Sequence, residues 1–202
     1  MNMLELLEKT DQSLFLLING WHSPFWDQVM WLVSTKWLWI PLYLFILGWL
    51  IKIFKRRFWI LLIFIILLVV VTDQTSVHLF KDVFKRLRPC HNETLAPMVH
   101  LVKGHCGGMY SFVSSHATNM FGIAAFVTLL LRNRTFTIVM YLIVALIGYS
   151  RIYLGVHFPG DVVAGALVGT FLGWLIYLLF KETDRRWLER NPYFNPVNKE
   201  KR

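Results

Sequence analysis

Long apolar runs are the main feature of the hydrophobic pattern. Residues 58–71 and 162–180 contain no charged side chain, and the second run is close to the roughly 20 apolar residues that a helix needs to cross a bilayer. Similar runs recur along the chain, so the pattern predicts five membrane-spanning helices, at residues 37–54, 58–80, 115–131, 136–153 and 159–180. The predicted fold class is therefore all-α: a polytopic transmembrane helical bundle that forms one membrane domain over residues 1–202.

The N-terminal region has a different pattern. Residues 4–19 carry apolar side chains at Leu4, Leu7, Leu14, Phe15 and Leu17 with charged ones between them, which predicts an amphipathic helix lying in the membrane interface. The charges are too many for the apolar core of a cleavable signal peptide. Residues 23–34 form a further short or re-entrant element, so the number of spans is five or six.

Composition supports the membrane assignment. The chain is 56% hydrophobic and 16% charged, whereas soluble domains are about 45–50% apolar and about 25% charged. A net charge of +9 would suggest a nucleic-acid partner in a soluble protein. Here many basic residues stand at the ends of apolar runs, where they fix topology, so no nucleic-acid partner is predicted.

Three basic clusters predict the orientation. They contain Lys52, Lys55, Arg56 and Arg57; Arg132 and Arg134; and Lys181, Arg185, Arg186 and Arg190. If the spans alternate, all three lie on one side, which is the cytoplasm, and residues 181–202 form a basic cytoplasmic tail. Residues 81–113 and the turn near His157 then share the opposite side. That side also carries basic residues, against the topological bias, and an anionic ligand would explain them.

The first candidate motif covers residues 81–89. Lys81 and Arg88 are seven residues apart, so a continuing helix would place them two turns apart on one face, with Lys85 between them. Pro89 would end that helix at Arg88. Taken alone, the segment fits a basic collar at a membrane interface equally well.

The second motif covers residues 111–119 and opens the third span. Ser114 or Ser115 is a suitable N-cap, and the first-turn amides of a helix form a natural phosphate site. His116 would stand beside that site. Taken alone, this is more often an ordinary helix cap with an interfacial histidine.

The third motif covers residues 150–161. Arg151 lies at the exit of the fourth span, Gly155 interrupts the helix, and Pro159 suits the first turn of the fifth. Asp161 follows His157 by four residues, close enough to accept a hydrogen bond from one imidazole nitrogen. The other nitrogen would then be free to attack an electrophile. The competing interpretation is a capping carboxylate beside an unrelated histidine.

Together, the three segments resemble the signature blocks of the type-2 phosphatidic acid phosphatase family: K-x6-R-P, P-S-G-H and S-R-x5-H-x3-D. The first and third blocks match at every signature position. The second departs at Val113, where the family has proline, and at Ser115, where it has glycine. The second departure affects the backbone at the phosphate cradle, because glycine permits conformations that serine resists.

The resemblance implies a mechanism for this chain. His157 would attack phosphorus to form a phosphohistidine, Asp161 would orient His157, and His116 would protonate the leaving oxygen. The phosphate oxygens would be bound by Lys81, Arg88, Arg151, Ser114 and the amide of Ser115 or His116. Three cations can neutralise a phosphoryl group without a metal, so neither a metal nor another cofactor is expected.

The predicted substrate is a lipid phosphate or pyrophosphate whose tail stays in the bilayer. Undecaprenyl pyrophosphate is the favoured candidate, for an enzyme of the bacterial inner membrane with its site facing the periplasm or exterior. Phosphatidylglycerophosphate, phosphatidic acid and lipid A phosphates stay open, and so does the oligomeric state. A soluble-substrate member of the superfamily is a further alternative. A non-catalytic protein that binds or transports anionic lipids is another, but it gives no reason for His116, His157 and Asp161.

Two further features have several interpretations. The segment between the first two blocks contains Cys90 and Cys106 together with three histidines. An oxidising periplasm favours a disulfide, while a zinc site and free thiols stay open. Asp73 lies inside the second span, where an ionisable group is costly; it pairs with Lys81, is protonated, or bonds to another helix.

Overall fold

The computed structural model describes residues 2–188, and these contain helices, turns and one isolated bridge between Leu87 and Tyr110. The all-α prediction is confirmed. The α-helices are α1 (Met3–Gly20), α2 (Pro24–Ser34), α3 (Ile40–Phe54), α4 (Phe58–Gln74), α5 (Asp82–Phe84), α6 (Ser115–Leu131), α7 (Arg134–Tyr153) and α8 (Pro159–Thr183).

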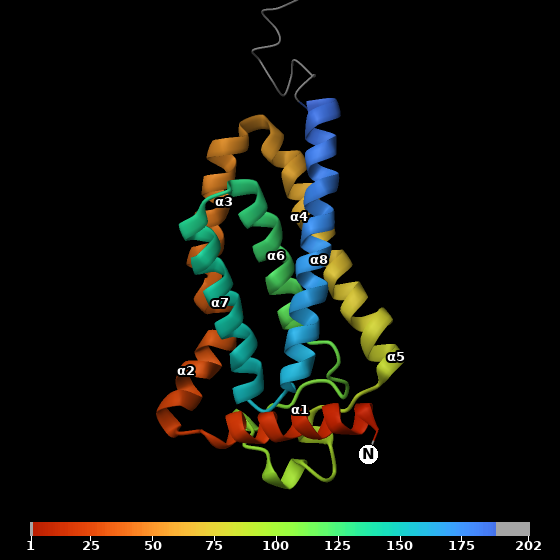
Figure 1. Ribbon diagram of the computed structural model, residues 1–202. Helices are drawn as coiled ribbons and strands as arrows, with labels where there is room; N and C mark the ends of the chain where they lie inside the picture. The colour runs from red at the N-terminus through yellow and green to blue at the C-terminus, as the bar shows by residue number, and fades with distance from the viewer. Residues whose placement is uncertain (1, 189–202) are drawn as a thin grey trace, which may run out of the picture.

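Three helical stretches in the described residues are long and apolar enough to cross a membrane: Lys36–Phe84, Arg134–Tyr153 and Pro159–Arg186. The first reverses direction at the basic turn Lys55–Arg57, so it contains two antiparallel helices, α3 and α4 (Figure 1). α6 is a shorter apolar helix. With 11 residues, α2 is about 16 Å long, against a hydrocarbon core of about 30 Å; it is too short to be a sixth span by itself.

α1 lies crosswise at one end of the bundle (Figure 1), as expected of an interfacial helix. It is fixed to the bundle by Phe15, which packs edge-on against Phe158 with 5.3 Å between ring centroids. Buried Asn19 donates to the carbonyl oxygens of His100 and Tyr153. Most of the leucines of α1 stay exposed, so they are available to lipid.

The packing of α8 against α6 has almost no space for side chains. At Gly169, a Cβ atom would overlap the carbonyl oxygen of Thr118, and at Gly173 it would overlap that of Gly122. Small residues allow such close approach of helices where water cannot drive association. The close packing continues to the N-terminal ends of both helices, where a Cβ atom at Gly165 would lie 2.8 Å from the carbonyl oxygen of Ser114; these ends carry the second and third motifs.

The two ends of the bundle carry different chemistry. The turns α3–α4 and α6–α7 and the C-terminal end of α8 lie together at one end, as the topology prediction requires (Figure 1). There Arg57 donates to the carboxylate of Asp184 at 2.9 Å. All three motifs lie at the other end, with α1. Of the predicted basic tail, residues 189–202 lie outside the described part of the chain.

The α6–α8 contact yields a stability prediction. Gly169→Ala forces the two helices apart, and overpacking of this kind costs about 1–3 kcal/mol. The melting temperature in detergent should therefore fall. The matched control is Gly48→Ala in α3, where nothing lies within 4 Å of the added methyl group; equal melting temperatures for the two variants would contradict the close-packing account.

Candidate active site

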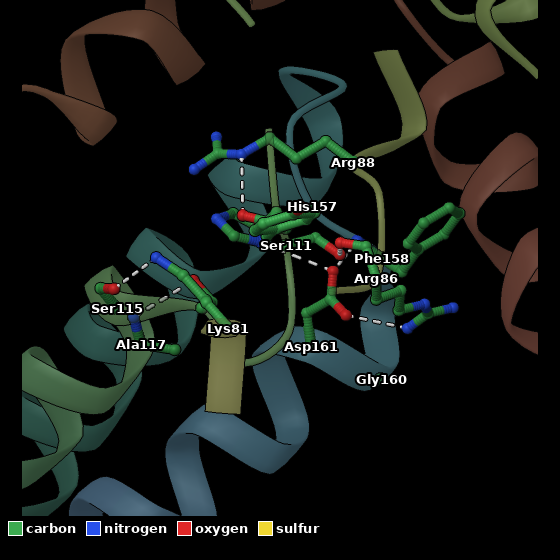
Figure 2. A network of polar contacts seen from close by, with 12 residues as sticks. Lys81, Arg86, Arg88, Ser111, Ser115, Ala117, His157, Phe158, Gly160 and Asp161 are labelled. Atoms are coloured by element: carbon green, nitrogen blue, oxygen red, sulfur yellow. Dashed lines mark hydrogen bonds and ion pairs between the residues drawn. The ribbon is translucent and has the colours of Figure 1, made fainter. Parts of the chain in front are cut away.

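The three motifs meet at the end of the bundle covered by α1. Figure 2 shows Lys81 and Arg88 from the first motif and Ser115 from the second close to His157 and Asp161 from the third. The charges of Arg88, Arg151 and Asp161 all act on Lys81. Residues separated by up to 80 positions in the sequence thus form one polar site.

His157 and Asp161 form the centre of this site. His157 directly precedes Phe158, the N-cap of α8, and Asp161 lies in the first turn of the helix. Both side chains are almost fully buried, and Nδ1 of His157 is 3.5 Å from Oδ2 of Asp161. This distance is long for a hydrogen bond, but catalytic hydrogen bonds often shorten only when substrate binds. The pairing directs Nδ1 to the carboxylate and leaves Nε2 for a substrate.

The surroundings of His157 keep its imidazole neutral. Burial lowers the pKa of His157 to about 4, because the charged form loses its hydration. Asp161 opposes this shift, whereas the positive charges of Arg88 and Arg151 add to it. At neutral pH the ring therefore has the unprotonated nitrogen that a nucleophile needs.

Ser115 holds Lys81. The ammonium of Lys81 donates to Oγ of Ser115 at 2.6 Å, and this hydroxyl also lies 2.7 Å from Oγ of Ser76. Ser115 stands where the signature block has glycine, so the departure from the block supplies an additional partner for the lysine.

Ser114 is the N-cap of α6. Its hydroxyl accepts from the amide of Ala117 at 3.4 Å, and its own amide donates to the carbonyl oxygen of Asp161 at 3.0 Å. The predicted N-cap is confirmed, and the hydroxyl proton of Ser114 is left for a further acceptor. The amide bond to Asp161 joins the second motif directly to the third.

Arg88 is held by the loop that a disulfide closes. Cys90 and Cys106 are bonded to each other, and the carbonyl oxygen of Cys106 accepts from the Arg88 guanidinium at 2.8 Å. Gly107 lies against the guanidinium, with a positive φ of 82° that favours glycine. His91 lies beside both sulfurs, but sulfurs bonded to each other provide no thiolate ligand for zinc.

Arg151 and His116 border a cavity of about 570 Å³. One guanidinium nitrogen of Arg151 donates to the hydroxyl of Ser34. Its buried Nε has no partner among the described residues, so this donor is available to an anion. The cavity continues toward α2 and the start of α3, where Lys36, Trp31 and Trp37 contribute to its wall.

The prediction that the helix continues to Arg88 is wrong. α5 ends at Phe84, and Lys85 has a left-handed backbone with φ 48°. The chain therefore turns before Arg88, and exposed Lys85 does not lie on a stripe between Lys81 and Arg88.

Asp73 does not form a direct ion pair with Lys81 in the described part of the chain. Lys81 bonds to Ser115 instead, and Asp73 acts on the lysine only through its charge. Asp73 and His116 both line a small cavity of about 190 Å³.

Sequence reasoning missed two residues at the site, Arg86 and Asp11. Arg86 donates to Oδ1 of Asp161 at 2.8 Å and to Oδ2 of Asp11 at 2.7 Å. In the sequence, Arg86 is one of several basic residues in its segment, and Asp11 is one of several charges in an amphipathic helix. No local pattern distinguishes either residue from its neighbours.

Comparisons with known proteins show what this chain is similar to. Residues 57–185 match the model of the PAP2 superfamily. A lipid A 4'-phosphatase from Bacteroides thetaiotaomicron is 38% identical, over 94% of this chain and 85% of its own length. One from Porphyromonas gingivalis is 35% identical, over 92% and 79%. The crystal structure of a transmembrane PAP2-type phosphatidylglycerolphosphate phosphatase from Bacillus subtilis is similar with a TM-score of 0.69 and 24% identity, covering 90% and 89% of the two chains.

The low pKa of His157 predicts the acidic limb of the pH profile. The imidazole of His157 is neutral above its pKa and becomes protonated as the pH falls through about 4, so it would lose the capacity to act as a nucleophile there. We expect kcat/KM for a phosphate ester to decline on the acid side only near this pH. Initial rates of phosphate release at a series of pH values measure this pH dependence. An acidic limb near pH 6.5, the pKa of an ordinary histidine, would contradict the assignment of the limb to His157.

The contact between Arg88 and Cys106 predicts sensitivity to reduction. Opening the disulfide frees the loop whose carbonyl positions the Arg88 guanidinium. If Arg88 binds the phosphate as predicted, phosphate binding would weaken and KM should rise several-fold. The measurement compares wild type with and without dithiothreitol. The double variant Cys90→Ser/Cys106→Ser is the control: it should resemble the reduced protein and show no response to the reductant.

Proposed function

We propose, because this chain belongs to the PAP2 superfamily of membrane lipid phosphatases, that it removes a phosphate group from lipid A or a closely related phosphorylated glycolipid. The observation that carries the proposal is the near full-length similarity to two lipid A 4'-phosphatases. It moves the preferred substrate away from undecaprenyl pyrophosphate, which the sequence favoured.

The cavity beside His116 supports a sugar headgroup. In the proposed mechanism His116 protonates the leaving oxygen, so the leaving group extends toward this cavity. Its volume of about 570 Å³ lies within the usual range of ligand sites. Trp31 and Trp37 offer flat apolar rings, while Thr35, Lys36 and His105 offer polar groups. A sugar ring has both apolar faces and hydroxyl groups, so it suits this wall better than a polyprenyl chain does.

The reaction has two steps in this proposal. Nε2 of His157 attacks phosphorus in line and the bond to the leaving oxygen breaks, with His116 giving that oxygen a proton. Water then attacks the phosphorus of the phosphohistidine and gives a proton to His116, and the bond between phosphorus and Nε2 breaks, which releases inorganic phosphate and restores neutral His157. Lys81, Arg88 and Arg151 neutralise the phosphoryl oxygens, so the chain's own cations supply the stabilisation that transfer requires.

The proposal includes the arrangement of the helices in the membrane. α3, α4, α6, α7 and α8 form five spans, and α1 lies in the interface over the site. The basic turns lie on the cytoplasmic side by the positive-inside bias. The active site then faces the periplasm or exterior of a bacterial inner membrane, within reach of lipid headgroups in that leaflet.

Undecaprenyl pyrophosphate is the second candidate. Lys36 in the cavity wall is a further cation close to the predicted phosphate clamp, and its charge acts on His116. A substrate with two adjacent phosphates would place the second one near such a cation.

Phosphate release from purified protein in detergent with EDTA tests the function. The panel contains lipid A, undecaprenyl pyrophosphate, phosphatidylglycerophosphate and phosphatidic acid. We expect the highest kcat/KM on lipid A and a loss of at least about 1000-fold in His157→Ala, because the nucleophile is removed. His78→Ala is the matched control, since His78 is exposed and pairs only locally with Asp82.

Other outcomes change the conclusion in defined ways. A preference for undecaprenyl pyrophosphate would move the substrate and keep the mechanism. Release that survives in His157→Ala would overturn the nucleophile. No release from any lipid by folded protein would leave a non-catalytic anionic-lipid binder.

A further inference from the structure

Arg86 has more contacts at the site than a surface cation would have. It donates to Oδ1 of Asp161 at 2.8 Å and to Oδ2 of Asp11 at 2.7 Å. Its guanidinium carbon also lies 4.1 Å from the centroid of the Phe158 ring, over the residue that follows His157. Figure 2 shows Arg86 and His157 on either side of the Asp161 carboxylate.

Asp11 joins this group to α1. Its Oδ1 accepts from the amide of Gly160 at 2.7 Å, in the first turn of α8, where a negative charge also suits the helix dipole. A Cβ atom at Gly160 would lie 2.8 Å from the Asp11 carboxylate, so glycine makes the contact possible. Asp11 therefore bonds at once to the helix that carries Asp161 and to the arginine that binds Asp161.

Burial makes these contacts energetically important. The Asp161 side chain is fully buried, and those of Asp11 and Arg86 are 15% and 24% exposed. Hydrogen bonds between ionised groups are stronger than neutral ones, and a buried carboxylate that loses its partner is strongly destabilised. The orientation of Asp161 thus depends on Arg86.

We propose that Arg86 is a positioning residue that holds Asp161 against His157, and that Asp11 couples this hold to the position of α1 in the membrane interface. The inference rests on the proposed roles of His157 and Asp161. The exposed Leu4 and Leu7 would anchor α1 in lipid, and the position of α1 would then help to determine how Asp161 is placed against His157.

The charges around His157 give this proposal a signature in the pH profile. Asp161 from α8, Arg151 from α7, His116 from α6 and Arg88 from the loop all face His157, and Lys81 faces Asp161. The positive charge of Arg86 offsets part of the negative charge that Asp161 exerts on the imidazole of His157. Asp11 is a second acceptor for Arg86, so its negative charge weakens this effect.

The two substitutions should therefore act in opposite directions. Arg86→Gln leaves more negative charge at His157, which raises the pKa of His157 and moves the acidic limb of kcat/KM to higher pH. Asp11→Asn releases Arg86 to Asp161, so the limb moves to lower pH. A general loss of structure would not produce opposite shifts.

The first experiment measures kcat and KM against pH on whichever lipid phosphate the wild type hydrolyses fastest. We expect kcat of Arg86→Gln to fall about 10- to 100-fold, the usual size of a misplaced catalytic group, with little change in KM and with partial recovery in Arg86→Lys. The matched control is Arg57→Gln, which breaks the 2.9 Å ion pair to Asp184 at the far end of the bundle. It should lower stability and leave the pH profile unchanged.

The second experiment tests the coupling to α1 in vesicles. Leu4→Ser/Leu7→Ser weakens the anchoring of α1 and should lower kcat several-fold in the wild-type background. In the Asp11→Asn background the same pair of changes should have a much smaller effect, because the link to Asp161 is already cut. Equal effects in both backgrounds would overturn the coupling.

Failure of the inference is distinguishable from failure of the proposed function. An inactive wild type, or an active His157→Ala, would remove the catalytic pair on which the inference rests. An active wild type and an inactive His157→Ala, together with an Arg86→Gln variant that loses stability but keeps the wild-type pH profile and kcat, would overturn only the role of Arg86.

Discussion

The buried carboxylate of Asp161 is the constraint around which this end of the molecule is built. A fully buried charge is costly unless paired and hydrogen-bonded, and here the partners come from distant segments. Arg86 donates to one oxygen, the amide of Phe158 donates to the other, and His157 faces the second oxygen. The backbone carbonyl of the same residue accepts from Ser114. The hydrogen bonds of Asp161 therefore bring together the first motif, the start of α6 and the start of α8.

Close packing of α6 and α8 makes this convergence possible. Glycines on α8 let its backbone lie against α6, and the two N-terminal ends stay together at the level of the site. His116, near the start of α6, thereby comes close enough to His157 for their charges to interact. In membrane helices such contacts replace the hydrophobic effect that holds soluble helices together, so the fold and the site share one packing surface.

Much of the fold was predictable because its signals are local. The five apolar helices follow from runs of side chains that lipid accepts, and their structural ends differ from the predicted ones by a few residues. The amphipathic pattern of residues 4–19 similarly predicts α1. The end of the helix before Arg88 was misplaced, since the left-handed backbone at Lys85 belongs to a residue type that gives no such signal.

The sequence by itself determined the membrane class, the order of helices and the spaced residues that resemble a phosphatase signature, because periodicity and spacing are properties of neighbouring positions. Only the tertiary structure decided that Ser115 holds Lys81, that Cys106 supports Arg88, and that Arg86 bonds to both Asp161 and Asp11. The last two contacts join positions 75 residues apart. At such separations the sequence does not show which charged side chains will pair. The pairs form when the helices pack, because an unpaired charge is too costly to bury.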